Sequence, residues 1–203
     1  DQAYKLLQVL KEADREGLNP RDYGSDRAEA LLSRVNKRSG TDNTVTPEIW
    51  ADLDLTLTNA FLLYGIHVSE GRLDPGKWFY QWVPYRRNTD MVLILAEALE
   101  KKDVEGALKR LPPGYPAYAQ LRTELANYRR IAAQGGWAPI PDKLKLHRGS
   151  TGPAVTLLKK RLIIAGDLDP AALSEGRQFN RQLEEALQRF QQRHGLPASG
   201  VTD

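Results

Sequence analysis

Apolar residues in the first 140 positions recur mainly at intervals of three and four, which is typical of helices with one buried face. A long, mostly buried helix is predicted over residues 47–70, because Thr46-Pro47 is a favourable start and the apolar pattern continues to Ile66. Residues 53–57 alternate like a strand, but the whole apolar stretch is too long for one strand. The other helices of this region are predicted over residues 3–13, 26–35, 92–99, a short stretch after 103, and 118–132.

Polar caps and glycine or proline breaks separate these helices. Gly17 is predicted to stop the first helix, and Asp26 and Asp103 are predicted to cap two later ones. Pro112-Pro113-Gly114 is a strong break, and Gly135-Gly136 is predicted to end the helix before it. The region therefore reads as a series of helices joined by short turns.

A proline-rich segment, Trp137-Ala138-Pro139-Ile140-Pro141, is predicted to be an extended linker, because each proline disfavours a helix in the residue before it. Beyond it, Gly152-Pro153 is predicted to open one helix, and Leu183, Leu187 and Phe190 mark a second. Phe190 is predicted to be the central core residue between them. The chain is thus predicted to be all-α, with a helical domain over residues 1–142 and a small helical domain over residues 143–203.

The two predicted domains differ in charge. The chain of 203 residues carries a net charge of +3, but residues 1–142 have 19 basic and 20 acidic residues, whereas residues 143–203 have 10 and 6. The basic C-terminal region favours a polyanionic partner, either a carboxylate-rich wall polymer or nucleic acid, and is equally consistent with a solvated basic surface. No apolar run approaches the ~20 residues of a membrane span.

The sequence lacks the residue patterns that several kinds of chemistry require. The chain has no Cys, which excludes disulfides, thiolate zinc sites and a Cys nucleophile within it. His67, His147 and His194 are isolated, so no metal site and no cofactor are predicted. Asp52 and Asp54 would face different directions on a helix, which argues against a glycosidase pair.

The last sixty residues resemble the small three-helix-type peptidoglycan-binding module of bacterial wall enzymes. The resemblance rests on Leu146, Gly149, Gly152, Val155 and Leu158, then Phe190-Gln191, His194-Gly195-Leu196 and Gly200-Val201-Thr202. Two departures stand out: Ser199 occupies a position where that family usually has Asp, and Asp203 is the last residue where the family continues with one more short helix. The module is therefore expected to be truncated at its C-terminus.

The first 142 residues resemble the helical scaffold domain of the large Gram-negative L,D-transpeptidases. The pieces that carry this resemblance are Gly17 to Tyr23, Gly71-Arg72-Leu73-Asp74-Pro75, Trp82, Arg86-Arg87, Leu111 to Tyr118, Leu121 with Leu125 and Tyr128, and Gly136-Trp137. In that family the scaffold precedes the peptidoglycan-binding module, and a catalytic domain with a Cys nucleophile follows.

The two resemblances imply a non-catalytic region of a periplasmic L,D-transpeptidase, with its signal peptide removed. Its expected partners are peptidoglycan, through glycan strand and stem peptide, and the catalytic domain of the same polypeptide. The alternatives are a stand-alone wall-binding adaptor and a basic helical nucleic-acid-binding protein. The connection from Gly166 to Phe179 is too long for the turn of a helix-turn-helix motif, so no nucleic-acid partner is expected.

Candidate ligand-binding residues follow from the chemistry of the wall. Stem peptides carry carboxylates, which arginines bind well, and the candidates in the small domain are Arg148, Arg161, Arg189 and Arg193. The aromatic segment over residues 78–87 adds Trp82, which could stack on a sugar ring, and Arg87. The same rings could instead clamp that segment onto the helices, and no catalytic residue is predicted.

Overall fold

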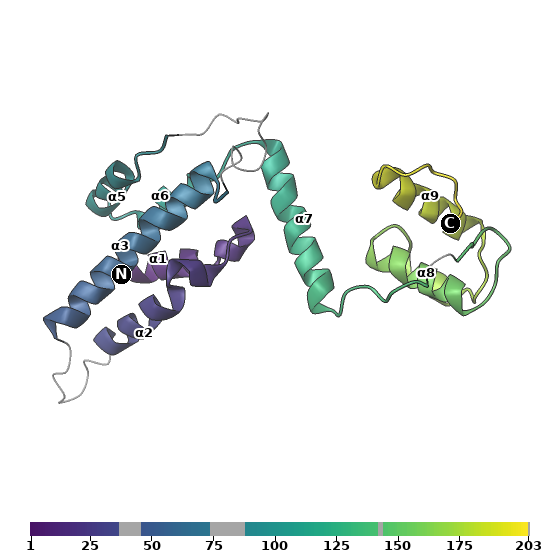
Figure 1. The fold of residues 1–203 in the computed structure, drawn as a ribbon, viewed down its shortest axis with the longest axis horizontal. Coiled ribbons are helices and arrows are strands. Elements are labelled where there is room, and N and C mark those ends of the chain that lie inside the picture. Colours follow the sequence, from purple (N-terminus) through teal and green to yellow (C-terminus); the bar gives the residue numbers. More distant parts are fainter. Residues whose placement is uncertain (37–45, 74–87, 142–143, 203) are drawn as a thin grey trace. The chain divides into compact units, whose positions relative to one another are not determined.

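The computed structural model describes residues 1–36, 46–73, 88–141 and 144–202 (Figure 1). Within them the chain forms eight α-helices and no strand, which confirms the predicted all-α class. No helix among the described residues combines the length and apolar character that a membrane span requires. The chain divides into two compact units, a first unit over Asp1–Ala126 and a second unit over Asn127–Asp203.

The first unit is built around its longest helix. The helices begin and end as follows: α1 Gln2–Lys11, α2 Ser25–Asn36, α3 Pro47–Glu70, α5 Met91–Glu100, α6 Val104–Lys109, and α7 Pro116–Ala133, with 3-10 turns η1 Ala13–Glu16 and η2 Pro20–Tyr23. Helix α3 contacts α1, α2 and α5. Its bounds confirm the prediction made from Thr46-Pro47, and Phe61 on its inner face is fully buried.

Local signals explain most helix starts of this unit. Asp103 caps α6 as predicted, since its carboxylate accepts a hydrogen bond from the Gly106 amide at 3.0 Å. The prediction that Asp26 caps α2 is wrong, because Gly24 takes a left-handed conformation (φ 64°) and the helix begins immediately after it, at Ser25.

Gly65 allows α5 to approach α3, because a Cβ there would lie 2.1 Å from Cε of Met91.

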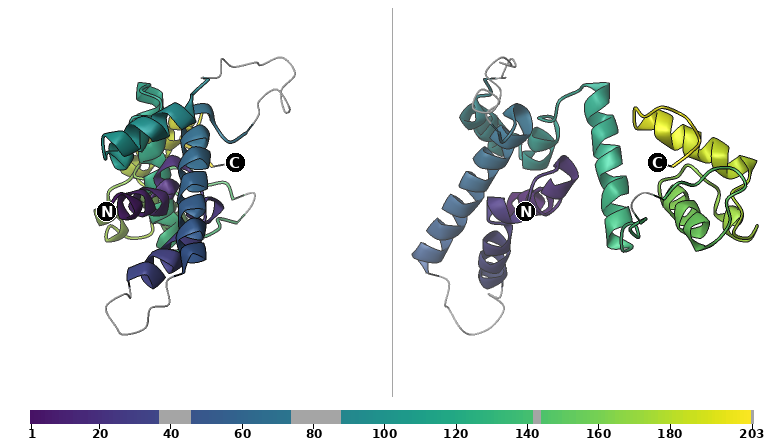
Figure 2. Two further views of the ribbon diagram at one scale, coloured as in Figure 1. Left: turned by 90° about the vertical axis from the view of Figure 1, so that its left-hand side faces the viewer. Right: turned by 45° about the vertical axis from the view of Figure 1, so that its right-hand side comes forward.

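The second unit contains two longer helices, α8 Pro153–Ile164 and α9 Arg181–Arg193, with the 3-10 turn η3 Pro170–Leu173 between them in sequence. α8 and α9 contact each other (Figure 2). Two isolated β-bridges, Leu146 with Thr202 and Thr151 with Gln178, tie the segments around them together.

The aromatic core residue of the second unit is Phe179, which is 1% exposed. The prediction that Phe190 has this role is wrong, because Phe190 is only partly buried at the edge of the core. Phe179 lies just before α9, where its amide donates to the carbonyl of Ser150 at 2.8 Å and its carbonyl accepts from the amide of Gly149 at 3.0 Å. These bonds hold Phe179 in the core cluster, together with residues of α8 such as Leu162 and residues of α9 such as Leu183.

The compact units divide inside α7, whereas the sequence predicted a domain boundary near residue 142. The last seven residues of α7, from Asn127 to Ala133, belong to the second unit, where the ring of Tyr128 packs edge-on against Trp137 of the linker at 5.8 Å between ring centres. The predicted boundary itself stays a prediction.

Candidate functional site

The second unit contains a cleft of about 510 Å3. We call it the Trp137 cleft. Its walls come from the linker over residues 137–141, from α8, from α9 and from the C-terminal segment. The lining residues that the argument uses are Trp137, Ile140, Arg161, Phe190, Gln191 and Thr202.

A stack of three side chains fixes the linker wall of the cleft. The guanidinium carbon of Arg161 lies 4.2 Å from the ring centre of Trp137, and Tyr128 meets the same ring edge-on. A cation over an aromatic face at this distance is attracted by the ring quadrupole. The indole Nε1 of Trp137 is buried and has no hydrogen-bond partner among the described residues. Stacking on Arg161 therefore holds this tryptophan.

The amide of Gln191 builds the C-terminal wall. Its Oε1 accepts a hydrogen bond from the Gly200 amide at 2.9 Å, and its Nε2 donates to the carbonyl of Val201 at 2.8 Å. Nε2 also lies 3.2 Å from Oγ of Ser199, the residue that departs from the family pattern. Thr202 extends this wall, because its Oγ1 accepts from the Leu146 amide at 2.8 Å. The polar groups of this wall are thus bonded to the protein itself.

The four candidate arginines of the second unit do not converge. Arg161 alone among them lines the cleft. Arg193 pairs with the carboxylate of Asp167 at 2.6 Å, and Arg189 donates to the main-chain carbonyl of the same residue at 3.0 Å. The hydrogen bond to Asp167 raises the pKa of the Arg193 guanidinium. Arg148 lies 3.9 Å from the carboxylate of Glu184.

Arg189 and Arg193 thus tie α9 to the turn after α8, a role that periodicity did not predict. The Asp167 side chain is 9% exposed, so the ion pair is shielded from water on one side. The candidates Trp82 and Arg87 lie outside the described residues.

Lys159 is one of the ten basic residues counted in residues 143–203, but it does not contribute to a basic surface. The residue is 1% exposed, and its Nζ donates to the carbonyls of Ala172 at 2.7 Å and Gly176 at 3.0 Å. A signal was present in the sequence, because position 159 lies four residues after Val155 and three before Leu162, on the inner face of α8. This lysine holds η3 and the loop after it against α8.

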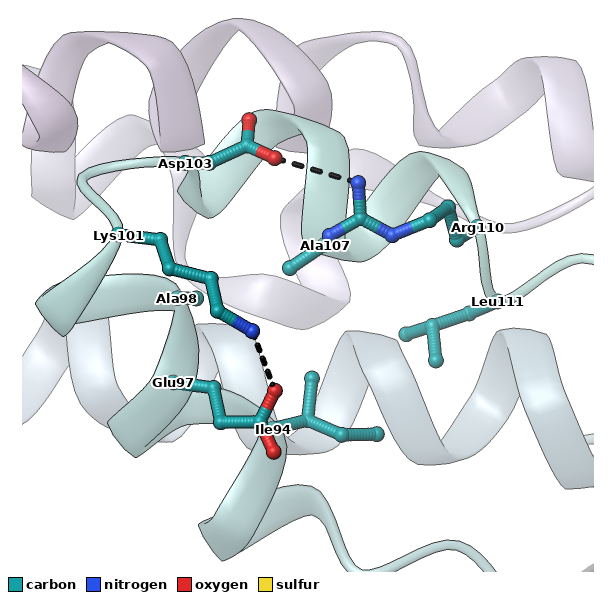
Figure 3. A pocket seen from close by; sticks show the side chains of 8 residues that line it. All are labelled: Ile94, Glu97, Ala98, Lys101, Asp103, Ala107, Arg110 and Leu111. Atoms are coloured by element: carbon teal, nitrogen blue, oxygen red, sulfur yellow. Dashed lines mark hydrogen bonds and ion pairs between the residues drawn. The ribbon is translucent and has the colours of Figure 1, made fainter.

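The first unit has a smaller pocket of about 160 Å3 between α5 and α6 (Figure 3). Two ion pairs line it, one on each side: Lys101 with Glu97 at 2.9 Å at the end of α5, and Arg110 with Asp103 at 3.2 Å along α6 (Figure 3). Hydrogen bonds from Lys101 and from Arg110 lower the pKa values of Glu97 and Asp103, respectively. Each of the four charges has a partner, so the pocket presents no unpaired charge to a ligand.

A second pocket of this unit, about 280 Å3, contains a buried carboxylate. The Glu16 side chain is 7% exposed; Arg122 pairs with it at 3.0 Å, and the hydroxyl of Tyr118 donates to it at 2.5 Å. Burial raises the pKa of Tyr64, on the same pocket, to about 12, and burial followed by the bond to Glu16 raises the pKa of Tyr118. Both oxygens of Glu16 are occupied, which indicates a structural role.

Residues of the kind that hold metal ions form no group of three in the described part of the chain. The arrangement of the second unit suits non-covalent binding: a preformed apolar cleft with one cation, Arg161, among its described lining residues.

Comparison with known proteins finds two family matches, one in each part of the chain. Residues 1–125 match the family model of the Scaffold domain, and residues 151–203 match that of the "Putative peptidoglycan binding domain". No curated protein matches the chain. The second match supports a peptidoglycan-binding module with a cell-wall-binding role. Because the first match covers more than half of the chain, the chain belongs to the Scaffold domain family.

Proposed function

We propose that this chain is the non-catalytic scaffold and wall-binding region of a periplasmic L,D-transpeptidase that cross-links the cell wall. The observation that carries the proposal is the order of the two matches, with a Scaffold domain first and a peptidoglycan-binding domain after it in one chain. That order agrees with the arrangement implied by the sequence resemblance.

The division of labour follows from the residues present. Acyl transfer by a thiolate needs a Cys, and the chain has none, so the reaction belongs to a catalytic domain elsewhere in the same polypeptide. The second unit holds peptidoglycan near that domain, which raises the local concentration of the stem peptides on which it acts. The first unit positions the catalytic domain.

Sedimentation with purified sacculi tests the binding part of this proposal. The chain is expected to pellet with sacculi and to stay in the supernatant without them. A matched test with duplex DNA addresses the alternative of a nucleic-acid-binding protein, for which affinity would fall steeply with salt. Recovery in the pellet independent of sacculi, or salt-dependent retention on DNA alone, would contradict wall binding.

The coding sequence tests the proposal that this region belongs to an L,D-transpeptidase. Reading the frame beyond the codon for Asp203 is expected to reveal a Cys preceded by His and Gly. A stop codon there would instead support a stand-alone adaptor.

The remaining candidate residues are tested by substitution in the same pulldown. Trp82→Ala and Arg87→Gln are expected to weaken retention if the aromatic segment contacts the wall, and unchanged retention with intact folding would remove them from the site. Arg148→Gln removes an exposed ion pair, which contributes only about 0–1 kcal/mol, so a small change is expected. Arg189→Gln and Arg193→Gln also disturb the bonds to Asp167, so their folding must be checked first.

A further inference from the structure

We propose that the Trp137 cleft binds the end of a stem peptide, through small apolar side chains and a free terminal carboxylate, and does not bind the sugar rings of the glycan. The inference rests on the proposed function and specifies which part of peptidoglycan the second unit recognises. It rests on the charge, the apolar walls and the bonded polar groups of the cleft.

The charge of the cleft favours a carboxylate. Arg161 is the sole charged residue among the described lining residues, and no Asp or Glu is among them. The ion pairs of the described residues engage Arg148 and Arg193 with carboxylates but leave Arg161 stacked on Trp137 without one. A planar guanidinium fixed by stacking retains edge N–H groups that can form two parallel hydrogen bonds to a carboxylate.

The walls of the cleft favour methyl groups over hydroxyl groups. Apolar side chains make up most of the lining: Pro139, Ile140, Leu144, Leu158, Leu162, Leu187, Leu196 and Val201. A sugar ring that entered would bury several hydroxyl groups, and each one without a partner costs about 1–3 kcal/mol. The alanine side chains of a stem peptide are single methyl groups, which such walls accept without this cost.

The polar lining groups are not available to a sugar. The amide of Gln191 is engaged by Gly200 and Val201, and Oγ1 of Thr202 is engaged by Leu144 and Leu146. The aromatic rings are engaged as well. Arg161 lies over Trp137, and the His194 ring is 4.3 Å from that of Phe190. The stacking platforms that a glycan would use are therefore occupied in part by the protein's own side chains.

One wall lies outside the region that matches a peptidoglycan-binding domain. That match begins at residue 151, whereas the linker from Trp137 to Pro141 contributes five of the lining residues. The linker consequently belongs to the binding site, and a fragment that starts after it would lack the face on which Arg161 is stacked.

Competition in the sacculus pulldown, with the whole chain, tests the proposal. The probes are a stem tetrapeptide with a free C-terminal carboxylate, the same peptide as its C-terminal amide, and a peptide-free glycan fragment. The free acid is expected to displace the chain, the amide to need about tenfold higher concentration because one charge-assisted bond is lost, and the glycan fragment to have no effect. The acid–amide comparison uses the unaltered chain, so it does not depend on the folding of a variant.

Arg161→Gln should abolish the difference in competition between the free acid and the amide. Lys160 is an exposed cation next to Arg161 on α8, and Lys160→Gln should preserve that difference. Three results would each overturn the proposal. The glycan fragment could displace the chain as effectively as the peptide does, or the acid and the amide could compete equally well. The third result is that the chain dimerises and that Arg161→Gln abolishes the dimer. In those cases retention on sacculi would persist and wall binding would stand. Failure of the unaltered chain to pellet with sacculi would instead contradict the proposed function.

Discussion

The two compact units stabilise a buried charge in different ways. In the first unit, the Glu16 carboxylate is neutralised by an opposite charge, Arg122 of α7, and by the hydroxyl of Tyr118. In the second unit, the Lys159 ammonium has only the main-chain carbonyls of Ala172 and Gly176 as its described hydrogen-bond acceptors. The first arrangement joins two helical segments, whereas the second fastens the 3-10 turn η3 and the loop after it to α8.

The difference follows from the size of the core. A small unit buries little apolar surface, so a few strong polar bonds and one aromatic ring carry much of its stability. The first unit has a larger core, in which Tyr23, Phe61, Leu10 and Leu108 are all nearly inaccessible. We therefore expect single substitutions to affect the second unit more severely than the first, and the following predictions test this in descending order of effect.

The largest effect is expected for Phe179→Ala. Removing a fully buried aromatic ring typically lowers the free energy of unfolding by about 3–5 kcal/mol, which is comparable to the whole stability of a small domain. Hydrogen exchange followed by mass spectrometry should show the second unit unprotected while the first keeps its protection. The matched substitution in the first unit, Phe61→Ala, should leave that unit folded but less stable. Equal loss of protection in both variants would contradict the comparison.

Lys159→Met is expected to lower the free energy of unfolding of the second unit by about 2–3 kcal/mol, because two hydrogen bonds from a charged donor are lost and a buried carbonyl is left unpaired. Denaturant unfolding measures this loss. Lys160→Met is the control, since that exposed neighbour should change stability by no more than about 0.5 kcal/mol. A similar small change for both variants would mean that Lys159 is solvated.

Helix α3 and Phe179 show which parts of the fold the sequence could predict and which it could not. The bounds of α3 followed from Thr46-Pro47 and a continuous apolar pattern, which are local signals. Phe179 could not be identified in this way, because it is buried through main-chain bonds to Gly149 and Ser150, thirty residues earlier in the chain. Periodicity instead indicated Phe190, which does continue the apolar face of α9 but ends at the edge of the core.

The candidate site was predicted only in part. The need for a cation selected Arg161 together with three other arginines, and charge alone cannot distinguish a free guanidinium from one bonded to Asp167. Trp137 was recognised as part of a linker, because its neighbouring prolines are a local signal. Its place on Arg161 depends on the packing of the linker against α8, which is a tertiary contact.

Glu16→Gln is expected to destabilise the first unit by about 1.5 kcal/mol. The amide still accepts the hydrogen bond from Tyr118, but the ion pair with Arg122, which is shielded on the side of Glu16, is lost. A double-mutant cycle with Arg122→Gln measures the coupling between the two residues. Additive losses would show that the two charges do not interact, and the contrast with Lys159 would then disappear.

The last effect appears only at alkaline pH and is absent at neutral pH. Because the folded-state pKa of Tyr64 is raised from 10.0 to about 12, its contribution to stability is complete below pH 10 and is lost as the pH rises through 12. One such group can change the free energy of unfolding by at most about 1.4 kcal/mol per pH unit. Denaturant unfolding across this interval should show a steeper decline for the unaltered chain than for Tyr64→Phe. Parallel declines would contradict the raised pKa.

The side-chain amide of Gln191 has a consequence for the time scale on which the C-terminal segment opens. By accepting from the Gly200 amide and donating to the Val201 carbonyl, it pairs with the main chain much as a neighbouring strand would. Gly200 lies in a loop with φ 70°, where amide protons ordinarily exchange with solvent within seconds or faster. Here that proton can leave only when α9 releases the segment, so a glycine outside any helix should exchange as slowly as the helix that holds it.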